Sequence, residues 1–147
     1  MTIPRFARGK FYPKNQEKYV GLKTPTYRSG WEHAFMWLCD EHPNVYKWAS
    51  ESIRIPYRHP LTGKYTIYVP DFFIVYTDKE GRKHAELVEV KPKAQTTMEN
   101  AGRSHAKQKQ VVINTAKWEA ASAYARQNKI KFRVVSEEQL FHQGTRK

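Results

Sequence analysis

Two apolar runs joined by a short polar turn constrain the fold of this chain most strongly. Residues 69–93 read VPDFFIVYTDKEGRKHAELVEVKPK, with Asp71 inside the first run and Glu89 inside the second. The turn DKEGR fits a three-residue hairpin loop in which Gly81 adopts the left-handed conformation. The segment therefore predicts two paired antiparallel strands, each with a carboxylate among apolar residues.

The turn also predicts which residues face one another. If Asp78 pairs with Arg82, counting seven residues away from the turn on each strand places Asp71 opposite Glu89, with Cβ atoms roughly 4.5–5.5 Å apart. Opposed carboxylates repel, and such a pair persists when a cation lies between them or when one of them holds a proton. Lys91 shares a face with Glu89 because side chains alternate with a period of two. Two carboxylates and an ammonium group are therefore expected on one face of the hairpin.

This cluster has the composition of a metal-assisted hydrolytic site. Pro70 cannot donate to a sheet ladder, which indicates a bulge or a sheet edge that opens the site to a substrate. Carboxylate oxygens favour Mg²⁺ or Mn²⁺, and Mg²⁺ commonly binds one or two carboxylates plus a substrate phosphate. Lys91 is expected to position water or to stabilise charge on the phosphorus. The structural alternative makes Asp71 a bulge residue and leaves Glu89 and Lys91 as solvated neighbours; the apolar surroundings of both strands favour the site.

The charge of the chain points to a polyanionic partner. Its 26 Lys and Arg residues against 14 Asp and Glu residues give a formal net charge of +12. Basic residues gather in residues 1–25 and 103–133, whereas acidic residues gather between them. This distribution is typical of basic flanks that bind nucleic acid around a central acidic site. No apolar run is long enough to span a membrane, so the expected location is the cytoplasm.

The length and the periodicity of the chain predict one α/β domain built on a mixed sheet. A length of 147 residues suits a single hydrophobic core. The expected elements follow the order αβββαβ: a helix over 29–41 with Ser29 as its N-cap, strands over 50–58, 64–78 and 82–92, a helix over 104–127 with Val111, Val112, Thr115, Trp118, Ala121 and Ala125 on its buried face, a strand over 129–136 and a short helix over 137–143. Residues 1–25 are expected to form an extended basic arm, and residues 26–147 a single domain.

Within this order, Pro70-Asp71 followed by Glu89-Val90-Lys91 resembles the motif of the PD-(D/E)XK nuclease superfamily. The resemblance covers about residues 29–135. It implies a restriction-endonuclease-like core and Mg²⁺- or Mn²⁺-dependent cleavage of DNA. Asp71, Glu89 and the Val90 carbonyl would bind the metal, and Lys91 would be the catalytic cation.

The same resemblance implies two further site residues. Glu32 matches an acidic position on the first helix of the superfamily, although Ser29-Gly30-Trp31-Glu32 is also a capping-box pattern. Polar residues of the next helix often face the site, which makes Gln108 a candidate; a solvated helix face explains Gln108 equally well.

Two groups in the superfamily are similar to residues 27–57 and to the two motif strands. They are the end-cutting endonuclease subunits of heteromeric transposases and the small head-completion nucleases of T-even-type tailed phages. Residues 9–21, GKFYPKNQEKYVG, are close to the basic arm of the phage group, and the short chain leaves no room for a transposase-interaction domain. The resemblance therefore implies a DNA endonuclease of phage head completion or DNA packaging, located in the host cytoplasm or the virion. Its expected partners are DNA and proteins of the capsid vertex or portal.

Two alternatives stay open at this point. Arg8, Lys10 and Lys14 in the arm are candidates for phosphate contacts, which would give salt-dependent affinity for DNA; otherwise the arm wraps the domain through Phe11 and Tyr12. The whole protein is either a metal-dependent endonuclease or a non-enzymatic virion or DNA-binding component on the same fold. The intact set of two carboxylates and a lysine favours the enzyme.

Overall fold

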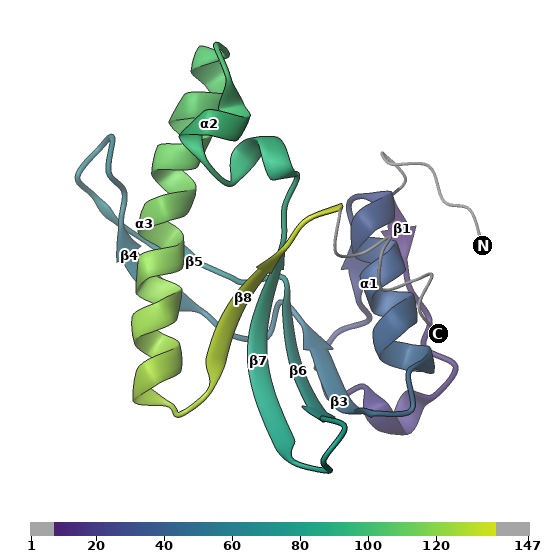
Figure 1. Cartoon of the computed structure of the whole chain (residues 1–147). Coiled ribbons are helices and arrows are strands. Elements are labelled where there is room, and N and C mark those ends of the chain that lie inside the picture. The colour runs from purple at the N-terminus through teal and green to yellow at the C-terminus, as the bar shows by residue number, and fades with distance from the viewer. Residues whose placement is uncertain (1–7, 138–147) are drawn as a thin grey trace.

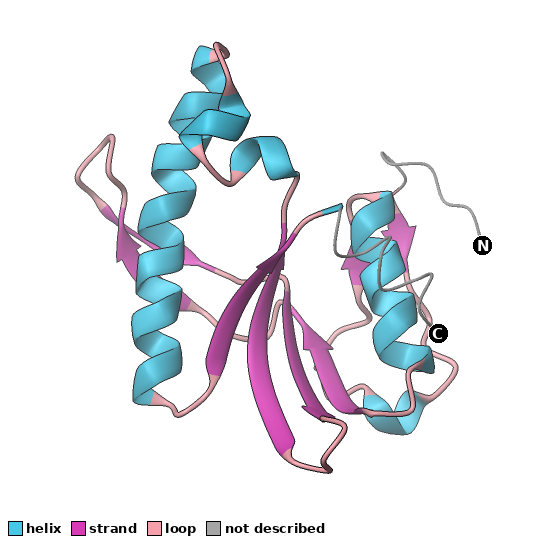
Figure 2. Cartoon of the chain, viewed as in Figure 1, coloured by secondary structure: helices cyan, strands magenta, loops and turns pink. Residues whose placement is uncertain are grey.

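The computed structural model describes residues 8–137, and its centre is a four-stranded mixed sheet. The strands are β3 (Val45–Ser50), β6 (Phe72–Thr77), β7 (Lys83–Val90) and β8 (Lys131–Val135), in that spatial order. β6 is antiparallel to both β3 and β7, and β8 runs parallel to β7. The helices α1 (Gly30–Glu41) and α3 (His105–Gln127) lie on either side of this sheet (Figures 1 and 2).

Alternating side chains of the sheet build one core on each face. Val88 packs in a cluster with Phe35 of α1, and the next residue back, Leu87, packs in a cluster with Ala121 of α3. By the same alternation Glu89 shares a face with Leu87. The expected α/β fold with a mixed sheet is therefore confirmed.

The predicted hairpin is present in the predicted register. Phe72 pairs with Val88 and Thr77 with Lys83. The Asp78 amide donates to the Arg82 carbonyl at 2.9 Å, and Gly81 has a φ of 79°. One step beyond the last ladder pair, Asp71 comes opposite Glu89.

Two strand predictions are wrong in their boundaries. The predicted strand over 64–78 is two strands, β5 (Tyr65–Tyr68) and β6, and β5 pairs instead with β4 (Ile55–Arg58) in a separate two-stranded sheet. Pro70 lacks the amide that a continuous ladder needs at this break. The predicted strand over 50–58 corresponds to β4, whereas the core position beside β6 belongs to β3, which the sequence did not predict. The order αβββαβ holds for the main sheet alone, as α1, β3, β6, β7, α3 and β8.

Residues 8–25 are not a free extended arm. β1 (Gly9–Lys10) pairs with β2 (Thr26–Tyr27), and a 3₁₀ helix, η1, spans Gln16–Lys18. The Phe11 side chain belongs to the core on the α1 side, as the wrapping alternative requires, but Tyr12 is 74% exposed. The Val20 amide donates to the Trp48 carbonyl at 2.9 Å, which covers the open edge of β3.

The two helix predictions agree with the structure within one residue. Ser29 caps α1 by accepting a bond from the Glu32 amide at 3.1 Å. On α3, Val111, Ala121 and Ala125 are buried as expected, but Thr115 is exposed and Asn114 is buried in its place.

The loop predicted after β7 contains a 3₁₀ helix, η2 (Lys93–Gln95), and a short helix, α2 (Met98–Ala101). The predicted helix over 137–143 lies outside the described residues except for its first position. Among the described helices, none combines the length and apolar character needed to cross a membrane.

Candidate active site

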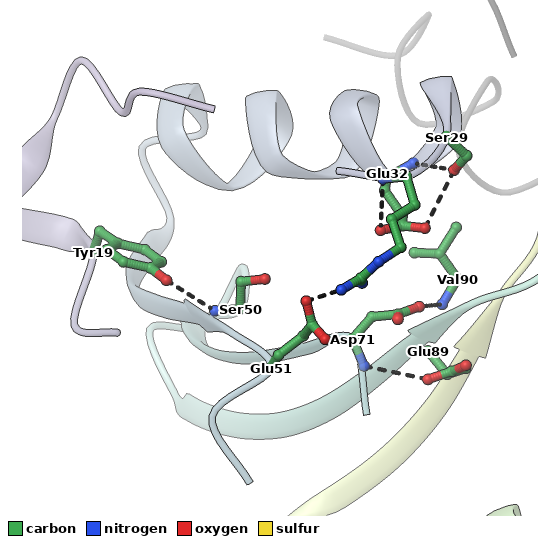
Figure 3. A network of polar contacts seen from close by, with 9 residues as sticks. Tyr19, Ser29, Glu32, Ser50, Glu51, Asp71, Glu89 and Val90 are labelled. Carbon is green, nitrogen blue, oxygen red and sulfur yellow. Dashed lines mark hydrogen bonds and ion pairs between the residues drawn. The ribbon is translucent and has the colours of Figure 1, made fainter. Parts of the chain in front are cut away.

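Asp71, directly before the start of β6, meets Glu89 near the end of β7. The Asp71 amide donates to Glu89 Oε1 at 3.2 Å, and Asp71 Oδ2 accepts a bond from the Val90 amide at 2.8 Å. Figure 3 shows both contacts, with the two carboxylates on neighbouring strands. The structure thus brings together the two acidic residues that the hairpin register placed opposite each other.

The surroundings oppose ionisation of both carboxyl groups. Burial and the nearby charges of Glu89 and Glu32 raise the pKa of Asp71 well above its ordinary value. Burial also raises the pKa of Glu89, against the Lys91 ammonium, which lowers it. A pair of carboxyl groups with raised pKa values inside a fold is typical of a functional site.

Two lysines supply positive charge beside this pair. Lys91 Nζ lies 3.6 Å from Glu89 Oε2. Lys117 of α3 places its Nζ 5.6 Å from the centre of the Tyr68 ring. Burial and the Lys91 charge lower the pKa of Lys117, while Glu89 and Asp71 raise it, so all four groups share one electrostatic environment.

Lys117 was not among the predicted site residues, although the sequence contains a pattern that indicates it. Lys117 lies between Asn114 and Ala121, three residues from one and four from the other, and both of these are fully buried. Residues at these spacings lie on one helix face. A lysine on a buried helix face indicates that its ammonium group has an acidic or polar partner inside the protein.

Tyr68 is a second site residue that was not among the predicted ones. Its hydroxyl donates to Glu89 Oε1 at 2.8 Å, and only 3% of the residue is exposed. Burial and the Glu89 charge raise the pKa of Tyr68, so this hydroxyl stays protonated as a donor. Tyr68 therefore holds one oxygen of Glu89 in place.

Glu32 takes part in the N-terminal cap of α1 and also lies near Asp71, while its catalytic role stays a prediction. Its Oε1 accepts a bond from the Arg28 amide at 3.3 Å, and its Oε2 lies 3.5 Å from Ser29 Oγ. The carboxylate therefore caps α1, through Arg28 and the Ser29 hydroxyl. In Figure 3 the Glu32 side chain also points from α1 toward Asp71, and its charge contributes to the raised pKa of Asp71.

An ion pair that the sequence did not indicate closes the α1 side of the site. Arg28 Nη1 lies 3.0 Å from Glu51 Oε1, and the Glu51 amide donates to the Asp71 carbonyl at 2.9 Å. Glu51 has a φ of 49°, unusual for a residue with a side chain. Arg28 thus brings a guanidinium group among Glu32, Glu51 and Asp71.

The remaining predicted residues lie farther from the carboxylates or have other partners. The Gln108 amide group donates to the Gly102 carbonyl at 2.8 Å near the start of α3, about nine helical residues before Lys117. Arg8, Lys10 and Lys14 are exposed, and the backbone amide of Lys14 donates to the Asp40 carboxylate at 3.0 Å. Their roles in DNA binding, like that of the Val90 carbonyl in metal binding, stay predictions.

The donor set suits a hard divalent cation. One oxygen of each carboxylate, Asp71 Oδ1 and Glu89 Oε2, accepts no hydrogen bond from the residues described here. In the same part of the chain, no group of three or more His, Cys, Asp and Glu side chains gathers as a metal site. A cation would therefore take two carboxylate oxygens and complete its shell with a backbone carbonyl, water or substrate, as Mg²⁺ commonly does.

A second buried acid, Glu86, lies in a different environment. It borders a cavity of about 420 Å³ between α1 and the sheet. Its two oxygens are engaged by the Tyr76 hydroxyl and by Arg133 Nε, the latter at 2.9 Å. Because its charge is already paired, Glu86 is not an alternative centre for the chemistry.

The sequence of the chain matches a known family across the strands that carry the site. Residues 42–137 match the family described as TnsA-like endonuclease N terminal, and this span contains Asp71, Glu89, Lys91 and Lys117. The chain belongs to this family. The TnsA-like domain is of the PD-(D/E)XK type, which confirms the resemblance stated from the motif. Glu32 and Arg28 precede the matched span.

One relative covers nearly the full length of this TnsA-like protein. It is the head completion nuclease of Enterobacteria phage T4, 36% identical over 142 residues, which are 90% of this chain and 92% of the relative. Homology to the phage group is confirmed.

Proposed function

We propose that this protein is a Mg²⁺- or Mn²⁺-dependent DNA endonuclease with a restriction-endonuclease-like core. The observation that carries the proposal is the contact of the half-buried Asp71 with the buried Glu89, two carboxyl groups with raised pKa values, next to Lys91. Burying like charges is costly, and a purely structural platform has no use for that cost. Membership of an endonuclease family and the name of the T4 relative support the same activity.

Each site residue has a role in this proposal. Asp71 and Glu89 hold the cation, with the Val90 carbonyl as a further ligand, and Tyr68 fixes the orientation of Glu89. The bound cation would polarise the scissile phosphate and lower the pKa of a water molecule. Lys91 orients the attacking water or stabilises the charge that develops on phosphorus.

The biological setting is part of the same proposal. By its similarity to the head completion nuclease of phage T4, the protein acts on DNA during head completion or packaging. Capsid vertex or portal proteins are its proposed partners, in the host cytoplasm or the virion. The net charge of +12 supports a DNA substrate, and Arg8, Lys10, Lys14 and Gln108 are proposed DNA contacts.

Plasmid cleavage tests this function directly. Supercoiled and linear plasmids are incubated with the purified protein and Mg²⁺, Mn²⁺ or EDTA. The expected result is nicking or linearisation with either metal and none with EDTA. If the protein binds DNA in a salt-dependent way but cuts under none of these conditions, the non-enzymatic alternative replaces the proposal.

Mn²⁺ is expected to raise the melting temperature, Tm, of the protein. A ligand that binds only the folded state at about 100 times its Kd adds about 2.7 kcal/mol of stability. In a domain of this size that corresponds to a Tm increase of about 10 °C. The measurement is thermal denaturation with Mn²⁺ and with EDTA. An equal Tm in both conditions would contradict a metal site at Asp71 and Glu89.

Glu32→Gln separates the two roles of Glu32. A glutamine can still accept the Arg28 amide bond with its one oxygen, and its NH2 group can donate to Ser29 Oγ instead of accepting from it. Since capping boxes use Glu or Gln, the Tm is expected to change little. Plasmid cleavage is expected to fall about 10–100-fold, because the negative charge facing Asp71 is lost. The readouts are Tm and initial cleavage rate. Wild-type cleavage by Glu32→Gln would restrict Glu32 to capping α1.

A further inference from the structure

The β4–β5 hairpin leaves the main sheet at the candidate site and returns there. β3 and β6 pair through Ser50 and Phe72, and the chain between them departs at Glu51 and returns at Asp71, joined by the 2.9 Å bond from the Glu51 amide to the Asp71 carbonyl. The turn of the hairpin projects beyond α3, away from the main sheet (Figure 1). The hairpin is therefore anchored at the carboxylates and extends outward from them.

One face of the hairpin is buried and the other is exposed. Ile55, Tyr57 and Tyr68 pack in the core cluster that includes Ala121 of α3. On the outer face, Arg58 pairs with Tyr65 and Pro56 pairs with Ile67, and all four are exposed.

The outer face exposes large apolar side chains. Tyr65 is 79% exposed, Ile67 is 43% exposed, and Leu61 in the turn is 55% exposed. Apolar and aromatic groups grouped on a projecting hairpin are typical of a binding surface.

The charge of the hairpin identifies the kind of partner. Residues 52–70 contain Arg54, Arg58 and Lys64 and no Asp or Glu. In the described part of the chain, no carboxylate forms an ion pair with these three residues. Arg58 Nε instead donates to the Gly63 carbonyl at 3.0 Å, which orders the turn and keeps the guanidinium group on the outer face. An unpaired basic surface with aromatic side chains complements a nucleic acid.

We propose that the outer face of the β4–β5 hairpin is a DNA-binding surface that holds the duplex beside the scissile phosphate. Arg54 and Arg58 on this face, with the exposed Lys64 beside the turn, contact phosphates. Tyr65 and Ile67 pack against sugars and base edges, as apolar side chains do in the minor groove. The hairpin runs about 20 Å from Tyr68 to its turn, at about 3.3 Å per residue. This length covers about six base pairs of duplex. The proposal deepens the proposed endonuclease function and rests on DNA being its substrate.

The test compares charge and apolar variants of the hairpin with a matched variant of another turn. The hairpin variants are Arg58→Gln with Lys64→Gln, and Tyr65→Ala with Ile67→Ala. The control, Lys79→Gln with Arg82→Gln, removes the same charge from the β6–β7 turn. The measurement is binding of a 20-base-pair duplex in EDTA at several salt concentrations, with Tm as the check of folding.

Each hairpin variant is expected to bind the duplex at least about tenfold more weakly than wild type, and the control within about twofold. Loss of two phosphate contacts should reduce the slope of log K against log salt by about 1.8, since each contact contributes about 0.9. Folded hairpin variants that bind DNA as wild type does would overturn the proposal. A capsid protein would then be the better candidate for the exposed apolar side chains.

A small substrate separates this proposal from the proposed function. Bis(p-nitrophenyl) phosphate is a phosphodiester too small to reach the hairpin, so its Mn²⁺-dependent hydrolysis is expected to be equal in wild type and in the hairpin variants. A parallel loss of this hydrolysis in folded hairpin variants would overturn the hairpin's role as a DNA surface and place its effect at the catalytic centre. Suppose that the wild type hydrolyses neither substrate, but binds the duplex more tightly than the hairpin variants do. The DNA-binding surface is then supported and the endonuclease function fails.

Discussion

Lys91→Met is expected to lower the rate of plasmid cleavage about a thousandfold. The ammonium group lies 3.6 Å from Glu89 Oε2, where it can stabilise charge on the phosphate or hold the attacking water. Removing one group that stabilises a transition-state charge costs about 10²–10³ in rate, and loss of a group that positions a proton acceptor adds to this. Methionine keeps the length and the apolar stem of the side chain but not the charge.

The fold is expected to tolerate this change. Lys117 remains close enough to oppose the charges of Glu89 and Asp71, so the Tm should fall by a few degrees at most. Lys131→Met, which removes an exposed lysine from the neighbouring strand β8, is the matched control and should cut at the wild-type rate. Cleavage by Lys91→Met within tenfold of wild type would rule out Lys91 as the catalytic cation. Lys117→Met, measured in the same assay, would then show whether the lysine of α3 has that role.

The sequence predicts the acidic centre because local chemistry sets it. The turn needs a left-handed residue, Gly81 provides it, and the turn then fixes the pairing of β6 with β7. A hairpin register follows from turn type and loop length. The approach of Asp71 to Glu89 is a consequence of that register and needs no information from distant parts of the chain.

The sequence could not predict Tyr68 because its position depends on tertiary structure. On one continuous strand over 64–78, Tyr68 and Asp71 would point to opposite faces, since they are three residues apart. In the structure, β5 and β6 belong to different sheets, and both residues contact Glu89. The sequence predicts a bulge or a sheet edge at Pro70, but it does not predict that the strands on either side of Pro70 belong to different sheets.

Arg28 and Glu51 illustrate a second limit. They are 23 positions apart in the sequence, and no local pattern connects them. Their ion pair depends on how the start of α1 packs beside the end of β3, which the core residues of both elements determine. Phe11 is similar in part, because the sequence offers its packing against the domain as one alternative but does not identify Trp48 as its partner.

Asp71→Asn is expected to raise the Tm of the metal-free protein while abolishing cleavage. Asparagine keeps an oxygen that can accept the Val90 hydrogen bond but removes one of the two charges that repel each other. Cross-strand charge pairs contribute about 0.2–1 kcal/mol, which corresponds to a Tm increase of about 1–4 °C in a domain of this size. The Tm increase produced by Mn²⁺ and the cleavage of plasmid should both disappear, because the site keeps a single charged ligand.

The pH dependence gives this prediction a definite sign. The pKa of Asp71 is higher in the folded protein than its ordinary value of 3.8. Above pH 3.8 the unfolded state therefore binds fewer protons than the folded state. As a result, the stability of the wild type falls as the pH rises through the folded pKa. The Tm difference between Asp71→Asn and wild type in EDTA should therefore be smallest near pH 4 and grow toward neutral pH. Contributions from other titrating groups largely cancel in this difference. A Tm difference that is constant with pH, or largest in acid, would mean that the fold does not raise the pKa of Asp71. The two carboxylates would then need no cation between them.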